Sequence, residues 1–254
     1  MSYHWEKITD DGGFAPCDGA GALVFRDKMW LLGGWNPDDK TNFPRICHSE
    51  VRSSTDGAQW KLENPNAPWE PRHCAGYVLH DGQMWIVGGD SSQGHHQTDV
   101  WKSSDGIVWQ LATNDAPWSP RGMIGGSVVF GSRMWLLGGG TFETPLRPQR
   151  KLYNEVWSSA DGLNWHQHPN APWAARQFHE VAVFDDKIWV LEGYTPDGGN
   201  RNDVWFSEDG ENWSELSGTP WSERHAASVF VFQNALWIVA GNNMQPDVWR
   251  LKNG

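Results

Sequence analysis

The sequence has little of what disulfide frameworks, nucleic-acid binding and membrane spans require. Cysteine accounts for only 3 of 254 residues, so no disulfide framework is expected. The 20 lysines and arginines are outnumbered by 31 acidic residues, and the net charge of −11 argues against nucleic acid as a partner. There is no apolar run of about 18 residues, and residues 1–13 lack the apolar core of a secretory signal. We therefore expect a cytoplasmic monomer without a membrane partner.

Helical patterns are also missing, because no segment keeps a helical apolar period over three turns. Glycine and tryptophan are abundant instead, at 28 and 19 residues. Short apolar runs such as MWLLGG (29–34) and MWIVGG (84–89) end in turn residues. This pattern of short strands and tight turns is typical of an all-β protein.

Nearly every tryptophan belongs to an internal repeat. The strand motif (M/I/L)W(L/I/V) recurs at intervals of 55, 50, 54 and 48 residues, at Trp30, Trp85, Trp135, Trp189 and Trp237. The DGxxW motif contains Trp60, Trp109, Trp165 and Trp213, with Trp5 in the same register. The VW motif contains Trp101, Trp157, Trp205 and Trp249, and the PW motif contains Trp69, Trp118, Trp173 and Trp221. Only Trp35 lies outside these sets, so five copies fill the chain.

Each copy predicts a sheet of four antiparallel strands, which cannot bury its two aromatic faces alone. Radial stacking of five such sheets solves this, and we expect a single-domain, five-bladed β-propeller. The predicted blades are about 14–63, 69–112, 118–168, 173–216, and 221–254 completed by residues 1–9. The last assignment rests on YHWEKI (3–8), which matches the fourth strand ENWSEL (211–216). The N-terminal strand is therefore expected to complete the last blade and close the ring.

The order of motifs in each copy resembles the kelch repeat, as in PRHCAGYVLHDGQMWIVGG (71–89). The resemblance implies that the strand after the arginine is innermost and that partners bind on the face where the loops after Gly-Gly open. It implies an inner ring of Arg72, Arg121, Arg176 and Arg224, with Cys17 in the first copy. It also implies an outer ring of Trp69, Trp118, Trp173 and Trp221, with Phe14 in the first copy.

Four guanidinium groups around one opening repel one another and need anions. The anions are either carboxylates of the protein, with Asp18, Glu70 and Glu223 as near candidates, or a ligand. We expect a binding module for an acidic sugar or an acidic peptide, held by the arginines and stacked on the tryptophans. The alternative is that both rings are structural, with the tryptophans packing the blades together.

Two long loops, 35–48 and 140–154, break the symmetry of the repeats and are expected to select the ligand or to hold a protein partner. The first carries Trp35, and the second carries Arg147, Arg150 and Lys151. A scaffold that binds only a protein partner through these loops is a further alternative.

The rival function is a carbohydrate-active enzyme on the same face, similar to the sugar epimerases or mutarotases among kelch-like proteins or to a hydrolase. Its candidate acids and bases are Glu192, His179, His73 and His225. Glu192 replaces a glycine of the repeat and is either a general acid or base or the counter-ion of the arginines. Strand alternation places the His179 and Glu180 side chains on opposite sides of the strand, so they are not expected to act together as an acid–base pair. His95 and His96 could bind a metal with Cys47 and His48, but their spacing matches no known ligand set, so neither metal nor cofactor is expected.

Overall fold

The computed structural model describes residues 6–38, 46–91, 95–122, 126–143, 148–196, 199–242 and 244–252. Its regular elements in these ranges are all β-strands, so the predicted all-β class is confirmed. None of the described residues forms a helix long and apolar enough to cross a membrane.

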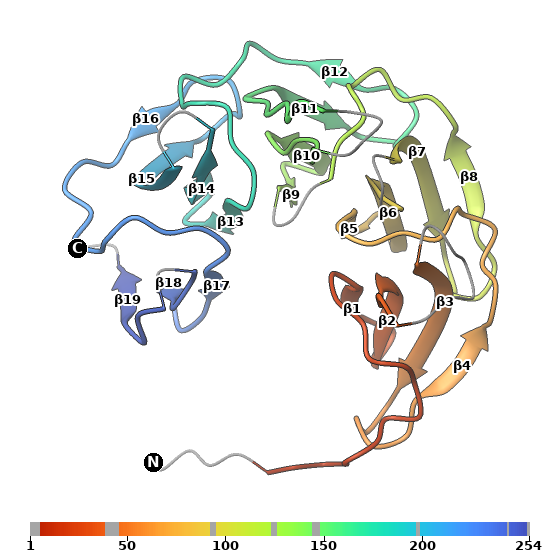
Figure 1. Ribbon diagram of the computed structural model, residues 1–254. Helices are drawn as coiled ribbons and strands as arrows, with labels where there is room; N and C mark the ends of the chain where they lie inside the picture. The colour runs from red at the N-terminus through yellow and green to blue at the C-terminus, as the bar shows by residue number, and fades with distance from the viewer. Residues whose placement is uncertain are drawn as a thin grey trace.

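The strands form five antiparallel sheets arranged as the blades of a propeller, as predicted (Figure 1). Blades 1 to 3 consist of β1 (Gly21–Phe25), β2 (Lys28–Trp35), β3 (Cys47–Ser54), β4 (Lys61–Asn64), β5 (Gly76–His80), β6 (Gln83–Asp90), β7 (His96–Ser103), β8 (Gln110–Thr113), β9 (Ser127–Phe130), β10 (Arg133–Leu137), β11 (Val156–Ser159) and β12 (His166–Gln167). Blades 4 and 5 consist of β13 (Glu180–Phe184), β14 (Lys187–Thr195), β15 (Gly199–Ser207), β16 (Ser214–Glu215), β17 (Ser228–Val231), β18 (Leu236–Val239) and β19 (Val248–Leu251). In each blade the first strand lies nearest the axis (Figure 1).

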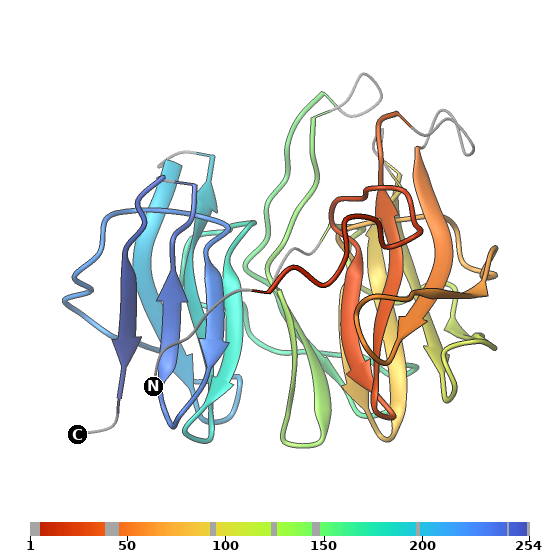
Figure 2. The same cartoon turned by 90° about the horizontal axis from the view of Figure 1, so that it is seen from below.

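A two-residue turn joins the first and second strands of every blade. Both central residues of each turn have φ between 48° and 65°: Arg26–Asp27, Asp81–Gly82, Gly131–Ser132, Asp185–Asp186 and Gln233–Asn234. Two positive φ angles are the mark of type I′ turns, whose twist matches that of the paired strands. These turns lie at one end of the propeller and the long loops at the other (Figure 2). We call the end with the long loops the loop face.

Neighbouring blades pack through a tryptophan of one and a glycine of the next. The strand tryptophans Trp30, Trp85 and Trp135 are 2–4 % exposed and cover Gly106, Gly162 and Gly210 of the following blade. A Cβ at any of these glycines would lie 2.1 or 2.2 Å from the indole ring. The glycine of the DGxxW motif is therefore required by the packing as well as by its turn.

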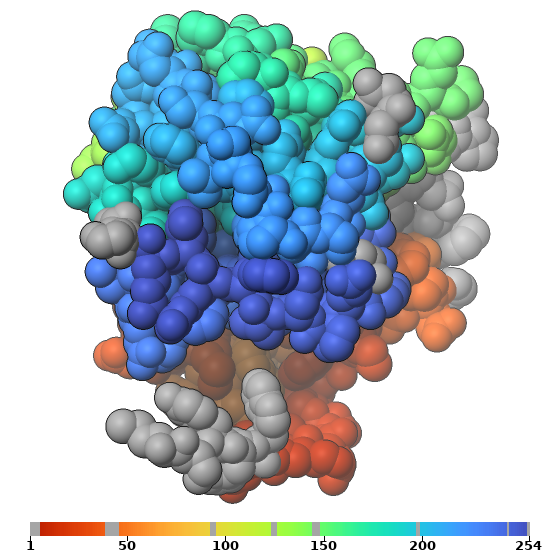
Figure 3. Space-filling view, turned by 90° about the vertical axis from the view of Figure 1, so that its left-hand side faces the viewer, coloured from red at the N-terminus to blue at the C-terminus, as the bar shows by residue number. Residues whose placement is uncertain are grey.

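Among the described residues, blades 1 and 5 each present one face without such a partner. A Cβ at Gly57 of blade 1 would meet only the Met29 methyl group, at 3.5 Å. On blade 5, Phe230 and Val231 are 54 % and 50 % exposed, and the Trp237 ring is partly exposed. The described part of the chain thus forms an arc that is open between blades 5 and 1 (Figure 1), and Figure 3 shows the molecule from the side on which blade 5 lies.

The predicted closing strand is not seen among the described residues. Blade 5 has three strands, in the order β17-β18-β19, and residues 6–9 belong to no strand. Residues 1–5, which include Trp5, lie outside the described residues. Closure by the N-terminal segment therefore stays a prediction.

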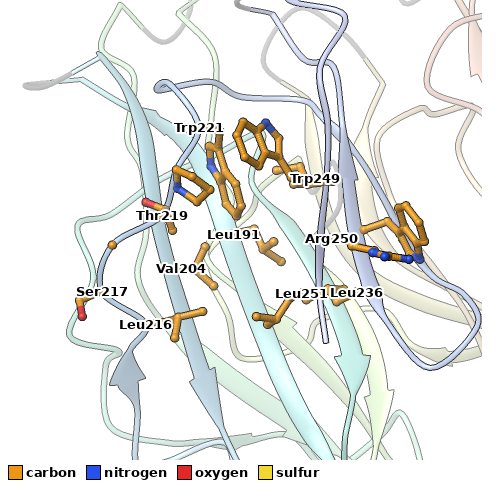
Figure 4. Close-up of a pocket in the computed structure, with 14 residues that line it drawn as sticks. Leu191, Val204, Leu216, Ser217, Thr219, Trp221, Leu236, Trp249, Arg250 and Leu251 are labelled. Atoms are coloured by element: carbon orange, nitrogen blue, oxygen red, sulfur yellow. The ribbon is translucent and has the colours of Figure 1, made fainter. Parts of the chain in front are cut away.

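An apolar cavity of about 340 Å³ lies between blades 4 and 5, beside β19. Leu191, Val204 and Leu216 line it below Trp221 and Trp249 (Figure 4). At the three preceding interfaces, the PW tryptophan contacts a DGxxW tryptophan edge to face, with ring centroids 4.4 or 4.5 Å apart: Trp69–Trp109, Trp118–Trp165 and Trp173–Trp213. In the described residues Trp221 has no such partner, and the cavity occupies the corresponding place.

Candidate functional site

The ring arginines are buried inside the blades and do not face solvent. Each has 0 % exposure: Arg72, Arg121, Arg176 and Arg224. Each pairs with the acidic residue that precedes the VW motif of its own blade: Asp99, Glu155, Asp203 and Asp247. The Arg176 guanidinium donates two hydrogen bonds of 2.7 Å to the Asp203 carboxylate and a third, also 2.7 Å, to the Glu192 carbonyl.

These pairs correct two expectations. The counter-ions are not Asp18, Glu70 or Glu223, and the arginines do not offer free positive charge at the channel mouth. The hydrogen bonds from Arg224 lower the pKa of Asp247 to about 2, so this carboxylate stays ionised and the charge of Arg224 stays compensated. Each arginine therefore connects segments within its own blade through its ion pair and hydrogen bonds. A buried guanidinium is stable only when it is paired.

The PW tryptophans are also structural in three of four copies. Trp69, Trp118 and Trp173 are each 2 % exposed and pack edge to face on the next tryptophan of the repeat. Their rings are covered, which corrects the expectation that they stack on a ligand. Trp221 is partly exposed and lines the cavity beside β19.

The loop face instead carries a row of aromatic and imidazole rings from partly exposed residues, among which the His96 side chain itself is buried. We call it the aromatic row, and it consists of Trp35, His73, His96, Phe142, Phe178, His225 and Tyr194. Neighbouring rings in it have centroids 5.3–6.2 Å apart. The one break is between His73 and His96, where Asp90 connects them: His73 Nδ1 lies 2.8 Å from its carbonyl and His96 Nε2 3.8 Å from its carboxylate.

The row brings together three of the predicted site residues from blades that are far apart in sequence. Trp35 stacks on His73, with an interplanar angle of 25°. His225 stacks on Phe178, with an interplanar angle of 29°, and its Nδ1 lies 2.6 Å from Asn200 Oδ1. Burial lowers the pKa of His225, so its imidazole is neutral near pH 7.

The second long loop contributes two residues to this surface, the predicted Arg150 and, in addition, Phe142. Phe142 joins the aromatic row, while Arg150 pairs with Glu143 at 3.1 Å and covers the Tyr194 ring at 5.2 Å from its centroid. Arg147 lies outside the described residues. Sequence reasoning missed Phe142 and Phe178, because neither belongs to a repeated motif.

Two carboxyl groups, those of Glu180 and Glu192, break the symmetry of the blades near the axis. Glu180 pairs in register with Leu191, so Glu192 follows directly beside it. The equivalent of Glu180 is a glycine in blades 1 to 3, at Gly21, Gly76 and Gly126. The equivalent of Glu192 is also glycine there, at Gly33, Gly88 and Gly138. Blade 4 alone therefore places two acids where the first three blades have none.

The environment of this carboxyl pair favours protonated acids. Glu192 is 0 % exposed; its Oε1 accepts a 3.0 Å hydrogen bond from the Ala227 N–H, and its Oε2 has no partner among the described residues. Burial, together with the charge of Glu180, raises the pKa of Glu192 to about 8. Burial raises the pKa of Glu180 to about 7. Glu192 also has a φ of +54°, which is strained for a residue with a side chain.

His179 has a structural role on the other side of the strand. Its side chain is fully buried, and its Nε2 lies 3.0 Å from the Leu137 carbonyl of blade 3. Burial and the charge of Arg176 lower its pKa to about 3, so it stays neutral. It is therefore no partner for Glu180, in agreement with the strand alternation.

The proposed role of Glu192 as counter-ion of the arginines is wrong. Arg176 pairs with the Asp203 carboxylate and donates only to the backbone carbonyl of Glu192.

The Glu192→Gln variant is expected to be more stable than the wild type in alkaline solution. A raised pKa means that the folded state holds the proton more tightly than the unfolded chain. The resulting stabilisation is complete below pH 4.5, falls as the pH rises, and is lost beyond about pH 8. Glutamine keeps the acceptor for Ala227 and cannot ionise, so the variant should gain about 2–4 kcal/mol over the wild type near pH 9.

Urea unfolding between pH 5 and pH 9 measures this difference, with the exposed Glu215→Gln as the matched control. Parallel pH profiles for the wild type and Glu192→Gln would show that Glu192 ionises freely.

Comparison with known proteins leaves the chain without an assigned family. No protein-family model matches it, and no curated protein does. The aromatic row and the carboxyl pair are therefore the features of the molecule that bear on its function.

Proposed function

We propose that this protein is a ligand-binding propeller whose site is the loop face, and that its ligand is a carbohydrate without a strict need for negative charge. The observation that carries the proposal is the aromatic row, whose residues other than the buried His96 side chain are partly exposed along the loop face of the blades. Sugar rings bind well to such surfaces, because their C–H edges meet aromatic faces and water is released. Asn200, hydrogen-bonded to His225, supplies a polar group for hydroxyls.

Among the described residues, the loop face offers little uncompensated positive charge, so this proposal differs from the sequence-based expectation of an anionic ligand. The ring arginines are neutralised by four carboxylates of the protein. Arg150, whose guanidinium lies over the Tyr194 ring, is paired with Glu143. We infer a kelch-like architecture from the five copies of the repeat, and this inference concerns the scaffold rather than the ligand.

The test is calorimetric titration of the whole chain with neutral oligosaccharides and with uronic-acid oligosaccharides, at low and high salt. We expect binding of a neutral oligosaccharide that changes little with salt and weakens about tenfold in Phe178→Ala or Phe142→Ala. The matched control is Phe232→Ala, an aromatic residue with 55 % exposure in the turn at the opposite end of blade 5.

Three other outcomes are informative. Binding of acidic oligosaccharides alone, weakened by salt, would restore the anionic class of ligand. Binding that survives both row variants would contradict the proposed site. Turnover of the bound saccharide, lost in Glu180→Gln while affinity remains, would identify an enzyme that uses the carboxyl pair as acid and base.

A further inference from the structure

We propose a binding site for a divalent transition metal, of the zinc or copper class, on the outer edge between blades 3 and 4. Its ligands are His166, His168 and Glu211, whose ligating atoms all lie within 4.8 Å of one another. The site lies away from the loop face and does not depend on the proposed function.

The local backbone brings the two histidines to the same side. His166 begins β12, the outermost strand of blade 3, and His168 follows two residues later, so alternation directs both side chains the same way. Their ring centroids are 4.7 Å apart. Glu211 comes from the DGxxW turn of blade 4, and its carboxylate lies 2.9 Å from His168 Nδ1.

His168 is held in place by groups that do not ligate. Its ring stacks on Trp135 with a centroid distance of 4.8 Å, and its Nε2 lies 2.8 Å from Ser158 Oγ. Arg133 Nε donates a 2.9 Å hydrogen bond to the same oxygen. A histidine fixed through one ring nitrogen presents the other to a metal with a defined orientation, and such hydrogen bonds to a ligating side chain raise metal affinity.

The chemistry of the donor set selects the class of ion. Two imidazoles and one carboxylate suit zinc, copper and nickel, whereas calcium and magnesium prefer sites made of oxygen alone. His166 is exposed and the Glu211 side chain is 49 % exposed, so water can complete the coordination. Because the ligands come from two blades, a bound ion would hold their outer edges together, and it would stabilise the fold more as the free zinc concentration rises above Kd.

The experiment is calorimetric titration of the whole chain with zinc chloride, paired with thermal unfolding with and without zinc. We expect one site per chain, a rise in Tm with zinc, and at least about a tenfold loss of affinity in His166→Ala and in Glu211→Gln. Both residues are exposed, so these variants should fold. His95→Ala, which changes an exposed histidine of blade 2, is the matched control and should bind zinc as the wild type does.

A second readout uses copper. Cu²⁺ should quench the emission of Trp135, and the difference in quenching between the wild type and Trp135→Phe should disappear in His166→Ala. The proposal is overturned if zinc binding survives both ligand variants, if it is lost in His95→Ala, or if zinc neither binds nor shifts Tm. The last result would leave His168 and Glu211 as a hydrogen-bonded pair only.

Discussion

Replacing Asp203 by alanine is expected to lower the free energy of unfolding by about 3–5 kcal/mol, because it leaves Arg176 buried without a counter-ion. Arg176 has 0 % exposure and both of its terminal nitrogens donate to this carboxylate at 2.7 Å. The same carboxylate accepts a 2.8 Å hydrogen bond from the Trp205 indole, so the substitution also removes a partner of the neighbouring motif. Urea unfolding near pH 7, followed by circular dichroism, measures the loss.

The matched control is Glu208→Ala in the same blade. The Glu208 side chain is 74 % exposed, and its 3.3 Å ion pair with Lys187 is a surface pair that water screens, so its loss should change stability little. Asp203→Asn should fall between the two, because asparagine keeps hydrogen-bond acceptors but no charge. If Asp203→Ala costs no more than Glu208→Ala, the internal pairing does not hold the blade, and the arginines return as candidates for binding an anion.

This pairing could have been found in the sequence. An acidic residue precedes the VW motif in each of the four copies that have the ring arginine, at Asp99, Glu155, Asp203 and Asp247. The first copy lacks the ring arginine, and its acidic residue pairs with another arginine instead. It has Cys17 in place of the arginine and Arg52 in place of the VW tryptophan, and Arg52 pairs with the preceding Glu50 at 2.9 Å.

The fold was predictable because each copy repeats the same local rules. A type I′ turn, a buried strand tryptophan and a glycine under the next indole recur from blade to blade, and repetition turns weak local signals into a strong one. The candidate site was only partly predictable for the opposite reason. Phe142 and Phe178 lie in non-equivalent segments of blades 3 and 4, and their stacking depends on loop geometry that no repeat specifies.

The carboxyl pair was more predictable than Phe142 and Phe178 but less predictable than the fold. Glu192 could be singled out because it replaces a glycine of the Gly-Gly motif. Its neighbour was harder to assign, since only the strand register shows that Glu180 also occupies a glycine position and lies beside Leu191. The burial that raises both pKa values depends on how the blades pack and cannot be read from either motif.

Replacing Trp5 by alanine is expected to lower the free energy of unfolding by about 3–5 kcal/mol, as much as Trp213→Ala. Trp213 fills the interface of blades 3 and 4 by packing edge to face on Trp173, with ring centroids 4.4 Å apart. The corresponding place beside Trp221 is the apolar cavity of about 340 Å³ next to β19 (Figure 4). Residues 3–8 have the pattern of a fourth strand, so an indole from this segment would complete the fifth blade in the same way.

Urea unfolding of the whole chain compares the two tryptophan variants with His4→Ala. In a strand, His4 and Trp5 point to opposite faces, so the histidine variant should stay within about 0.5 kcal/mol of the wild type. Equal losses for Trp5→Ala and Trp213→Ala would establish that the ring is closed by its own N-terminal segment. If Trp213→Ala lowers the free energy of unfolding and Trp5→Ala does not, closure by the N-terminal segment is contradicted. The edge of β19 would then be open to pairing with a strand of another chain. An unpaired strand beside an apolar cavity offers both backbone hydrogen bonds and a place for a large side chain.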